Sequence, residues 1–127
     1  LEHLPLSKLH VFPYSPRPGT RAASMAGPPP RHVARERAAQ LRAAGARILA
    51  RLARSHRGRR DWVLLEKYHD DGRASGWSGA YLASHIRGVD AGHTGQLVPV
   101  VFTEAHNGRL LGHLSQTGGH AAPTPAE

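Results

Sequence analysis

Apolar residues recur with a helical period in the first half of the chain. From Ala34 to Leu52 they are spaced by alternating steps of four and three residues, which is typical of one face of an amphipathic helix. Pro30 before this pattern and Gly58 after it are residues that commonly begin and end a helix. The sequence therefore predicts a helix of about seven turns. Its narrow apolar face consists of Ala34, Ala38, Leu41, Gly45, Ile48 and Leu52, widened by Leu49.

The period changes after Asp61 to that of short strands. Five segments rich in strand-forming residues follow with no helix between them, and turn residues such as Gly72 and the Asn107-Gly108 pair separate them. Five strands at this spacing are typical of a small closed barrel of the OB type. The expected fold is mainly β with one long helix. The five predicted strands are residues 61–68, 73–79, 81–88, 95–107 and 109–114.

The longest of these segments, residues 95–107, allows a more detailed prediction. Val98, Val100 and Phe102 are spaced by two residues, so they should share one face of the strand. Pro99 and Val101 then point outward. Because proline cannot donate a backbone hydrogen bond, we expect Pro99 to confine this stretch to an edge or a bulge.

The first twenty residues combine a short apolar run with a proline-rich turn. Residues 9–14, LHVFPY, are predicted to form an isolated strand, and residues 15–20 a turn. A strand without neighbours has unpaired backbone on both sides, so we expect this one to be exposed or badly packed. The chain opens with Leu1 and its only methionine is Met25, which favours a piece of a longer protein.

Positive charge is concentrated in the predicted helix. The net charge is +8 and the isoelectric point is about 11.3, and residues 31–60 hold ten arginines against one glutamate. Such a segment favours a polyanionic partner. Two interpretations stay open: direct contact with phosphates, or a solvated helix whose arginine stems cover the margins of the apolar face. The candidate RNA contacts in and after the helix are Arg47, Arg51, Arg54, Arg57, Arg59 and Arg60.

The strand region supplies further candidates for nucleic-acid contact. OB-type barrels commonly stack bases on exposed aromatic side chains that lie beside basic residues. Trp62, Trp77 and Tyr81 are candidates for stacking, and the alternative is that they pack in the core or at the rim of the barrel. The candidate basic contacts here are Lys67, Arg73 and Arg87.

Several classes of chemistry find no support in the sequence. The chain has no cysteine, which excludes disulfides, zinc ribbons and cysteine-held iron–sulfur clusters. Its ten histidines show no spacing typical of a metal site, and no phosphate-binding glycine loop is present. No run approaches the roughly 18 apolar residues of a membrane span. We therefore expect no metal, cofactor or catalytic residue in this chain, no membrane partner, and a cytoplasmic location.

The opening stretch LHVFPYSPRPGTRAASM resembles the segment that closes the catalytic barrel in the radical-SAM tRNA methylthiotransferases. The following RHVARERAAQLR is similar to that family's linker helix, and the strand region looks like its C-terminal TRAM domain, a small RNA-binding β-barrel. The form LHVFPYS most resembles the branch that acts on threonylcarbamoyladenosine beside the tRNA anticodon. The resemblance divides the chain into a remnant of the catalytic barrel at 1–25, a linker helix at 26–57, a TRAM barrel at 58–115 and a disordered tail at 116–127.

This resemblance implies that the chain binds RNA and that other domains carry out the catalysis. The family uses 4Fe-4S clusters and S-adenosylmethionine, held by N-terminal and radical-SAM domains that this chain lacks, so the chain alone should be non-catalytic. It would bind tRNA at the anticodon stem-loop. The resemblance places Arg17 near the substrate as an anion clamp; the alternative is a guanidinium that caps carbonyls within the turn.

The chain departs from the family pattern in two places. Arg21 replaces a rigid proline with a charge near the expected tRNA path. Pro99 and Val101 stand where the family tends to place basic residues, which weakens the expected binding of RNA by the barrel. Two alternatives therefore stay open beside a tRNA methylthiotransferase fragment. The chain could be a free-standing TRAM-like RNA-binding module without enzymatic activity, or the product of a degraded gene with no function of its own.

Overall fold

The computed structural model describes residues 3, 4 and 6–115, so the predicted tail at 116–127 lies outside the described residues. The chain divides into two compact units, Leu1–Ile48 and Leu49–Glu127. The boundary falls inside the long helix α1 (Arg31–Ser55). α1 begins directly after Pro30, and Gly58 follows its end in the left-handed conformation, with φ +75°. The predicted helix is confirmed.

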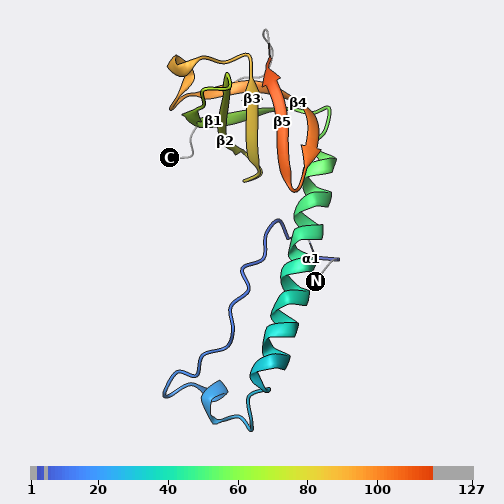
Figure 1. Cartoon of the computed structure of the whole chain (residues 1–127), viewed down its shortest axis with the longest axis vertical. Helices are drawn as coiled ribbons and strands as arrows, with labels where there is room; N and C mark the ends of the chain where they lie inside the picture. Colours follow the sequence, from blue (N-terminus) through green and yellow to red (C-terminus); the bar gives the residue numbers. More distant parts are fainter. Residues whose placement is uncertain (1–2, 5, 116–127) are drawn as a thin grey trace. The chain divides into compact units, whose positions relative to one another are not determined.

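Five strands form a closed barrel in the second unit. They are β1 (Arg60–Tyr68), β2 (Arg73–Ser78), β3 (Ala83–Arg87), β4 (Leu97–His106) and β5 (Arg109–Leu114). Their order around the barrel is β1-β2-β3-β5-β4, and β4 pairs back with β1 to close it (Figure 1). All the neighbours are antiparallel except β3 and β5, which are parallel. The prediction of a small closed five-stranded barrel with one long helix is confirmed.

The barrel core follows the alternation that the sequence predicts. Val98, Val100 and Phe102 are buried on one side of β4, and Phe102 is the largest fully buried side chain. The last turns of α1 complete this core, because Ala53 is fully buried in it and both Leu49 and Leu52 pack against it. The helical periodicity did not identify Ala53, which lies beside the predicted apolar face. The other large buried side chains are Leu65, Leu82, Ile86 and Leu110.

The turn between β4 and β5 shows why the Asn107-Gly108 pair occurs there. Both residues have positive φ, +48° and +74°, as the two central residues of a type I′ hairpin turn require. A Cβ added to Gly108 would also come within 2.8 Å of Leu49 in α1. Glycine therefore serves both the turn and its packing against the end of the helix.

The prediction for Pro99 holds only in part. Pro99 lies in β4 opposite Trp62 of β1, so β4 is paired on this side and is not an edge strand of the closed barrel. The irregularity in β4 comes later, between Phe102 and Glu104. On its other side Pro99 uses only its carbonyl oxygen, which accepts a hydrogen bond of 2.9 Å from the Ser115 amide just after β5. Proline fits because this position lies beyond the last residue of the neighbouring strand.

Residues 9–14 are coil and form no strand, and their backbone has no strand pairing, as expected for a segment without neighbours. The expected exposure holds: Phe12 is 79% exposed and Tyr14 is 55% exposed. Leu9 is partly covered, and it contacts Gly45 of α1, where an added Cβ would lie 3.1 Å from the Leu9 Cβ. The glycine in the apolar face of the helix thus allows a close contact with the coil.

Candidate nucleic-acid interface

A row of paired positions crosses the outer face of all five strands. Arg60 pairs with Val101, Val101 with His113, His113 with Arg87, and Arg87 with Arg73. Positions paired across strands share one face and lie about 5 Å apart. Arg60, Arg87 and His113 are exposed, and Arg73 and Val101 are partly exposed. We call these five residues the basic row, because three arginines and a histidine occupy it without a carboxylate.

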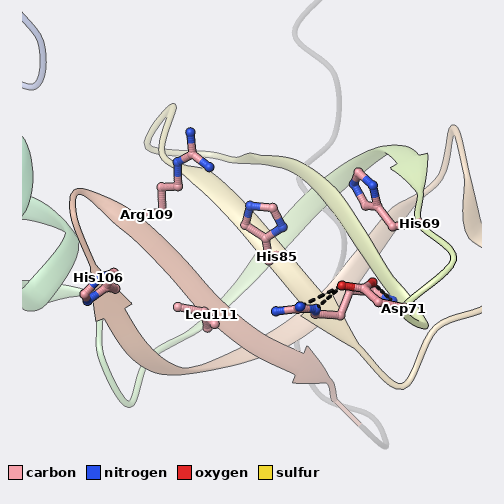
Figure 2. Close-up of a pocket in the computed structure, with 7 residues that line it drawn as sticks. His69, Asp71, His85, His106, Arg109 and Leu111 are labelled. Carbon is pink, nitrogen blue, oxygen red and sulfur yellow. Dashed lines mark hydrogen bonds and ion pairs between the residues drawn. The ribbon is translucent and has the colours of Figure 1, made fainter.

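A second row lies beside the basic row and leads into a pocket. Ser75 of β2 pairs with Lys67 of β1 on one side and with His85 of β3 on the other, and His85 pairs with Leu111 of β5. The pocket has a volume of about 210 Å³ and opens to solvent. Figure 2 shows the side chains that line it. They are His69, Asp71, Arg73, His85, His106, Arg109 and Leu111.

The strand connections explain why these side chains meet. His69 and Asp71 belong to the loop between β1 and β2, whereas His106 and Arg109 pair across the hairpin between β4 and β5. These two connections are far apart in sequence. The parallel pairing of β3 with β5 brings them to the same pocket, with His85 on the strand between them.

Asp71 is the one carboxylate among the pocket residues, and Arg73 neutralises its charge. The Asp71 Oδ2 accepts a hydrogen bond of 2.8 Å from Arg73 Nε and lies 2.6 Å from a terminal guanidinium nitrogen. The Arg73 backbone amide donates to Asp71 Oδ1 at 3.1 Å. Hydrogen bonding to Arg73 is the main cause that lowers the pKa of Asp71 below its usual value. The carboxylate is therefore ionised and holds the arginine side chain at the rim of the pocket.

His85 lies in an environment that disfavours its charged form. Burial is the first cause that lowers its pKa, followed by the positive charges of Arg109, Arg73 and His69, while Asp71 acts in the opposite direction. The centroids of the His69 and His85 rings are 6.3 Å apart. His69 Nε2 shares a hydrogen bond of 2.9 Å with Ser75 Oγ. At neutral pH the free pocket thus contains a neutral His85 among cationic neighbours.

The residues proposed from sequence are distributed over both units. Arg17 and Arg47 belong to the first unit, and the other eight belong to the unit that contains the barrel. Arg60, Arg73 and Arg87 fall in the basic row, and Lys67 lies beside it. Arg54, Arg57 and Arg59 are exposed where α1 leads into β1. Arg51 lies on α1, one turn earlier.

Arg17 belongs to a defined turn, but its side chain does not cap this turn, which was the alternative to the anion clamp. Its carbonyl oxygen accepts hydrogen bonds from the Thr20 amide at 3.3 Å and from the Thr20 hydroxyl at 2.8 Å. The turn continues into a short 3-10 helix, η1 (Arg21–Ser24). Within the described residues the Arg17 guanidinium makes no hydrogen bond or ion pair. The alternative in which it caps carbonyls of the turn is therefore wrong.

The three aromatic candidates differ in exposure. Trp62 is half-buried opposite Pro99, which fits a packing role. Trp77 is 41% exposed, and its indole nitrogen donates a hydrogen bond of 3.1 Å to Glu66 Oε2. Tyr81 is 83% exposed in the turn between β2 and β3. Trp77 and Tyr81 are thus the two aromatics with a face available for stacking.

Sequence reasoning identified Arg73 but missed the other four basic residues of the pocket. His69, His85, His106 and Arg109 line the pocket but were not among the predicted contacts. The strand alternation in ASHIR was a usable signal, because burying Ser84 and Ile86 places His85 on the outer face. The proximity of the other three depends on barrel closure, which no local pattern reveals.

A scan against protein-family models found no match to this chain, and a search of curated proteins found none either. Among the described residues, no three His, Cys, Asp or Glu side chains are grouped in a way that could hold a metal ion. No helix in the same part of the chain is long and apolar enough to cross a membrane.

Proposed function

We propose that this chain is an RNA-binding module and that its barrel is of the OB type. The strand order β1-β2-β3-β5-β4, with β3 and β5 parallel, supports this proposal. OB-type barrels bind oligonucleotides on the face of strands 2 and 3 and between the loops that join strands 1 to 2 and 4 to 5. The pocket draws its residues from these same places, and the basic row crosses the same face.

The basic row is the observation that carries the proposal. Like charges directly opposite one another on neighbouring strands are destabilising, yet Arg73 and Arg87 are paired. A phosphate chain laid across the row would neutralise these charges and release bound counterions, which is the main source of affinity for nucleic acid. The three arginines and the histidine of the row lie at positions other than Pro99 and Val101 of β4, the two positions where the family tends to have basic residues.

We further propose that the RNA is tRNA and that the module belongs to a methylthiotransferase of the threonylcarbamoyladenosine branch. Support comes from the resemblance of the opening motif, the helix and the strand region, in that order along the chain. The barrel would then be the family's TRAM domain. The clusters and S-adenosylmethionine would be held by other parts of a longer protein, because this chain has no cysteine with which to ligate a cluster.

A titration followed by fluorescence anisotropy tests this proposal. The whole chain is mixed with a labelled tRNA anticodon stem-loop and with a scrambled single strand, each at two salt concentrations. We expect binding that weakens with salt and is tighter for the stem-loop. Equal affinity for both RNAs would favour the free-standing RNA-binding module, and no binding at low salt would contradict RNA binding by this chain.

A further inference from the structure

The pocket on the barrel contains more positive charge than its one carboxylate can neutralise. Arg73, Arg109 and three histidines line it, and Asp71 is engaged with Arg73. The Arg109 guanidinium has no hydrogen-bond or ion-pair partner within the part of the chain that the structure describes. In Figure 2 the His85 ring lies between Arg109 and His69. An unpaired guanidinium thus faces a pocket together with an imidazole that can become a second donor.

The geometry points to a phosphate subsite in this pocket, where Arg109 and His85 bind the oxygens of one backbone phosphate of RNA. This inference rests on the proposed RNA binding. It adds which residues bind one phosphate, and that His85 takes up a proton when the phosphate binds. Arginine suits a phosphate because its planar guanidinium can donate two parallel hydrogen bonds. Protonated His85 would donate one more.

The pocket fits a phosphate better than a base. The His69 and His85 rings are tilted by 37° relative to one another, which leaves no parallel slot for a flat base between them. Leu111 is the only apolar side chain among the seven lining residues. A base needs a stacking surface and hydrogen-bond partners for its edge, whereas a phosphate needs only the cations that are present.

Binding of a phosphate in this pocket should be linked to the uptake of a proton. In the free protein, burial and the neighbouring cations lower the pKa of His85. A phosphate between His85 and Arg109 would add a negative charge close to the ring, and this charge favours the protonated form. The affinity for RNA should therefore rise as the pH falls from about 7.5 and His85 takes up its proton.

Other charged groups around His85 must be considered in such a linkage. The loop between β1 and β2 contributes His69 and Asp71, β2 contributes Arg73, and the hairpin between β4 and β5 contributes His106 and Arg109. Four more lie just outside the pocket. They are Lys67, which pairs with Ser75, Glu104, which pairs with Leu111, and Arg87 and His113, which pair with one another in the basic row. Because His69 and His106 are imidazoles in the same pocket, the experiment must isolate His85.

The test measures affinity for the labelled stem-loop between pH 5.5 and pH 8 at constant ionic strength. The chain is compared with His85→Gln, with Arg109→Gln and with a control, His32→Gln, whose exposed histidine lies at the start of α1. Circular dichroism confirms that each variant is folded. We expect the wild type and the control to gain about threefold to tenfold more affinity than His85→Gln on lowering the pH, since one linked proton changes affinity by at most about tenfold per pH unit.

The His85 imidazole is also followed by NMR during a pH titration, with and without RNA. We expect its midpoint to rise when RNA is bound, and Arg109→Gln to reduce that rise. An equal rise in sulfate at matched ionic strength would place a free anion in the pocket and overturn the assignment to RNA.

The outcomes separate the subsite from the proposed function. If RNA binds but His85→Gln keeps the pH dependence of the wild type and Arg109→Gln keeps its affinity, the phosphate subsite is wrong while RNA binding stands. If RNA binds at no pH, the proposed function is wrong, and the subsite is wrong with it.

Discussion

Arg73 and Arg87 are direct partners across β2 and β3, and their side chains share the outer face of the barrel. Two arginines in this relationship repel one another. Asp71 offsets the charge of Arg73, and its hydrogen bonds and ion pair go to Arg73 rather than to Arg87. This repulsion destabilises the free protein, and a bound polyanion would relieve it.

Removing the carboxylate of the pocket should strengthen RNA binding. In Asp71→Asn the side chain keeps nearly the same size but no longer neutralises Arg73, which is then available to a phosphate. We expect the affinity for RNA to rise by about twofold to fivefold, the range of a surface ion pair. The dependence of the affinity on salt should become steeper. Anisotropy titrations at several salt concentrations measure both effects, and an affinity below that of the wild type would mean that the ion pair positions Arg73 for RNA.

Gly76 should be required for the closed barrel. An added Cβ would collide with the backbone carbonyl oxygen of Leu64 on the neighbouring strand β1. We expect Gly76→Ala to destabilise the barrel by about 1 to 3 kcal/mol, because backbone has to move. The matched control is Gly79→Ala, whose Cβ would meet only Asp61 Oδ1 at 3.7 Å. Chemical denaturation measures both variants, and equal stability of the two would contradict the close approach seen at Gly76.

His85 should make the barrel less stable in mild acid. Its folded-state pKa is lowered, so below about pH 6.5 the unfolded chain binds a proton that the folded chain does not. Stability is therefore lost as the pH falls through this range. Since His85→Gln cannot take up that proton, its denaturation midpoint should fall less than that of the wild type between pH 7 and pH 5. A parallel fall in the two proteins would show that other groups cause the acid sensitivity.

The arginines of α1 offer an alternative location for binding of the phosphates. Changing Arg47, Arg51 and Arg54 together to Gln tests whether the helix binds RNA. If it does, the triple variant should bind all RNA sequences more weakly by the same factor. The slope of log affinity against log salt concentration should fall by about 0.7 to 0.9 for each phosphate that is no longer neutralised. Unchanged affinity would leave the barrel as the binding site.

The secondary structure of this chain is largely predictable, because its signals are local. The spacing of Ala34, Ala38 and Ile48 predicts α1, and the alternation of Val98, Val100 and Phe102 predicts β4. The predicted strand at residues 9–14 failed because a strand needs a partner, and the described chain provides none there. The environment of Pro99 was predicted only in part, because β4 can accommodate a proline there only since the neighbouring strand β5 has already ended.

The site is predictable in its parts but not in its arrangement. Arg73 and Arg87 are identifiable as basic residues on adjacent strands, yet their pairing depends on the register of the β2–β3 hairpin. The irregularity in β1 between Leu65 and Lys67 shifts the neighbouring register by one residue, and nothing in the sequence marks it. Arg109 reaches the pocket through the parallel pairing of β3 and β5. Such proximity of distant segments follows from closure of the barrel.

The most direct test of RNA binding by the basic row is the salt dependence of stem-loop affinity in the variant Arg60→Gln, Arg73→Gln, Arg87→Gln. Its control is Lys8→Gln, Arg21→Gln, which removes exposed positive charge from the first unit. If the row binds the phosphate chain, the triple variant should lose about tenfold or more in affinity at low salt, and its salt slope should fall by about 0.7 to 0.9 for each phosphate left without its arginine. The control should retain the wild-type slope. A triple variant that binds with wild-type affinity and an unchanged slope would contradict the assignment of RNA binding to this face of the barrel.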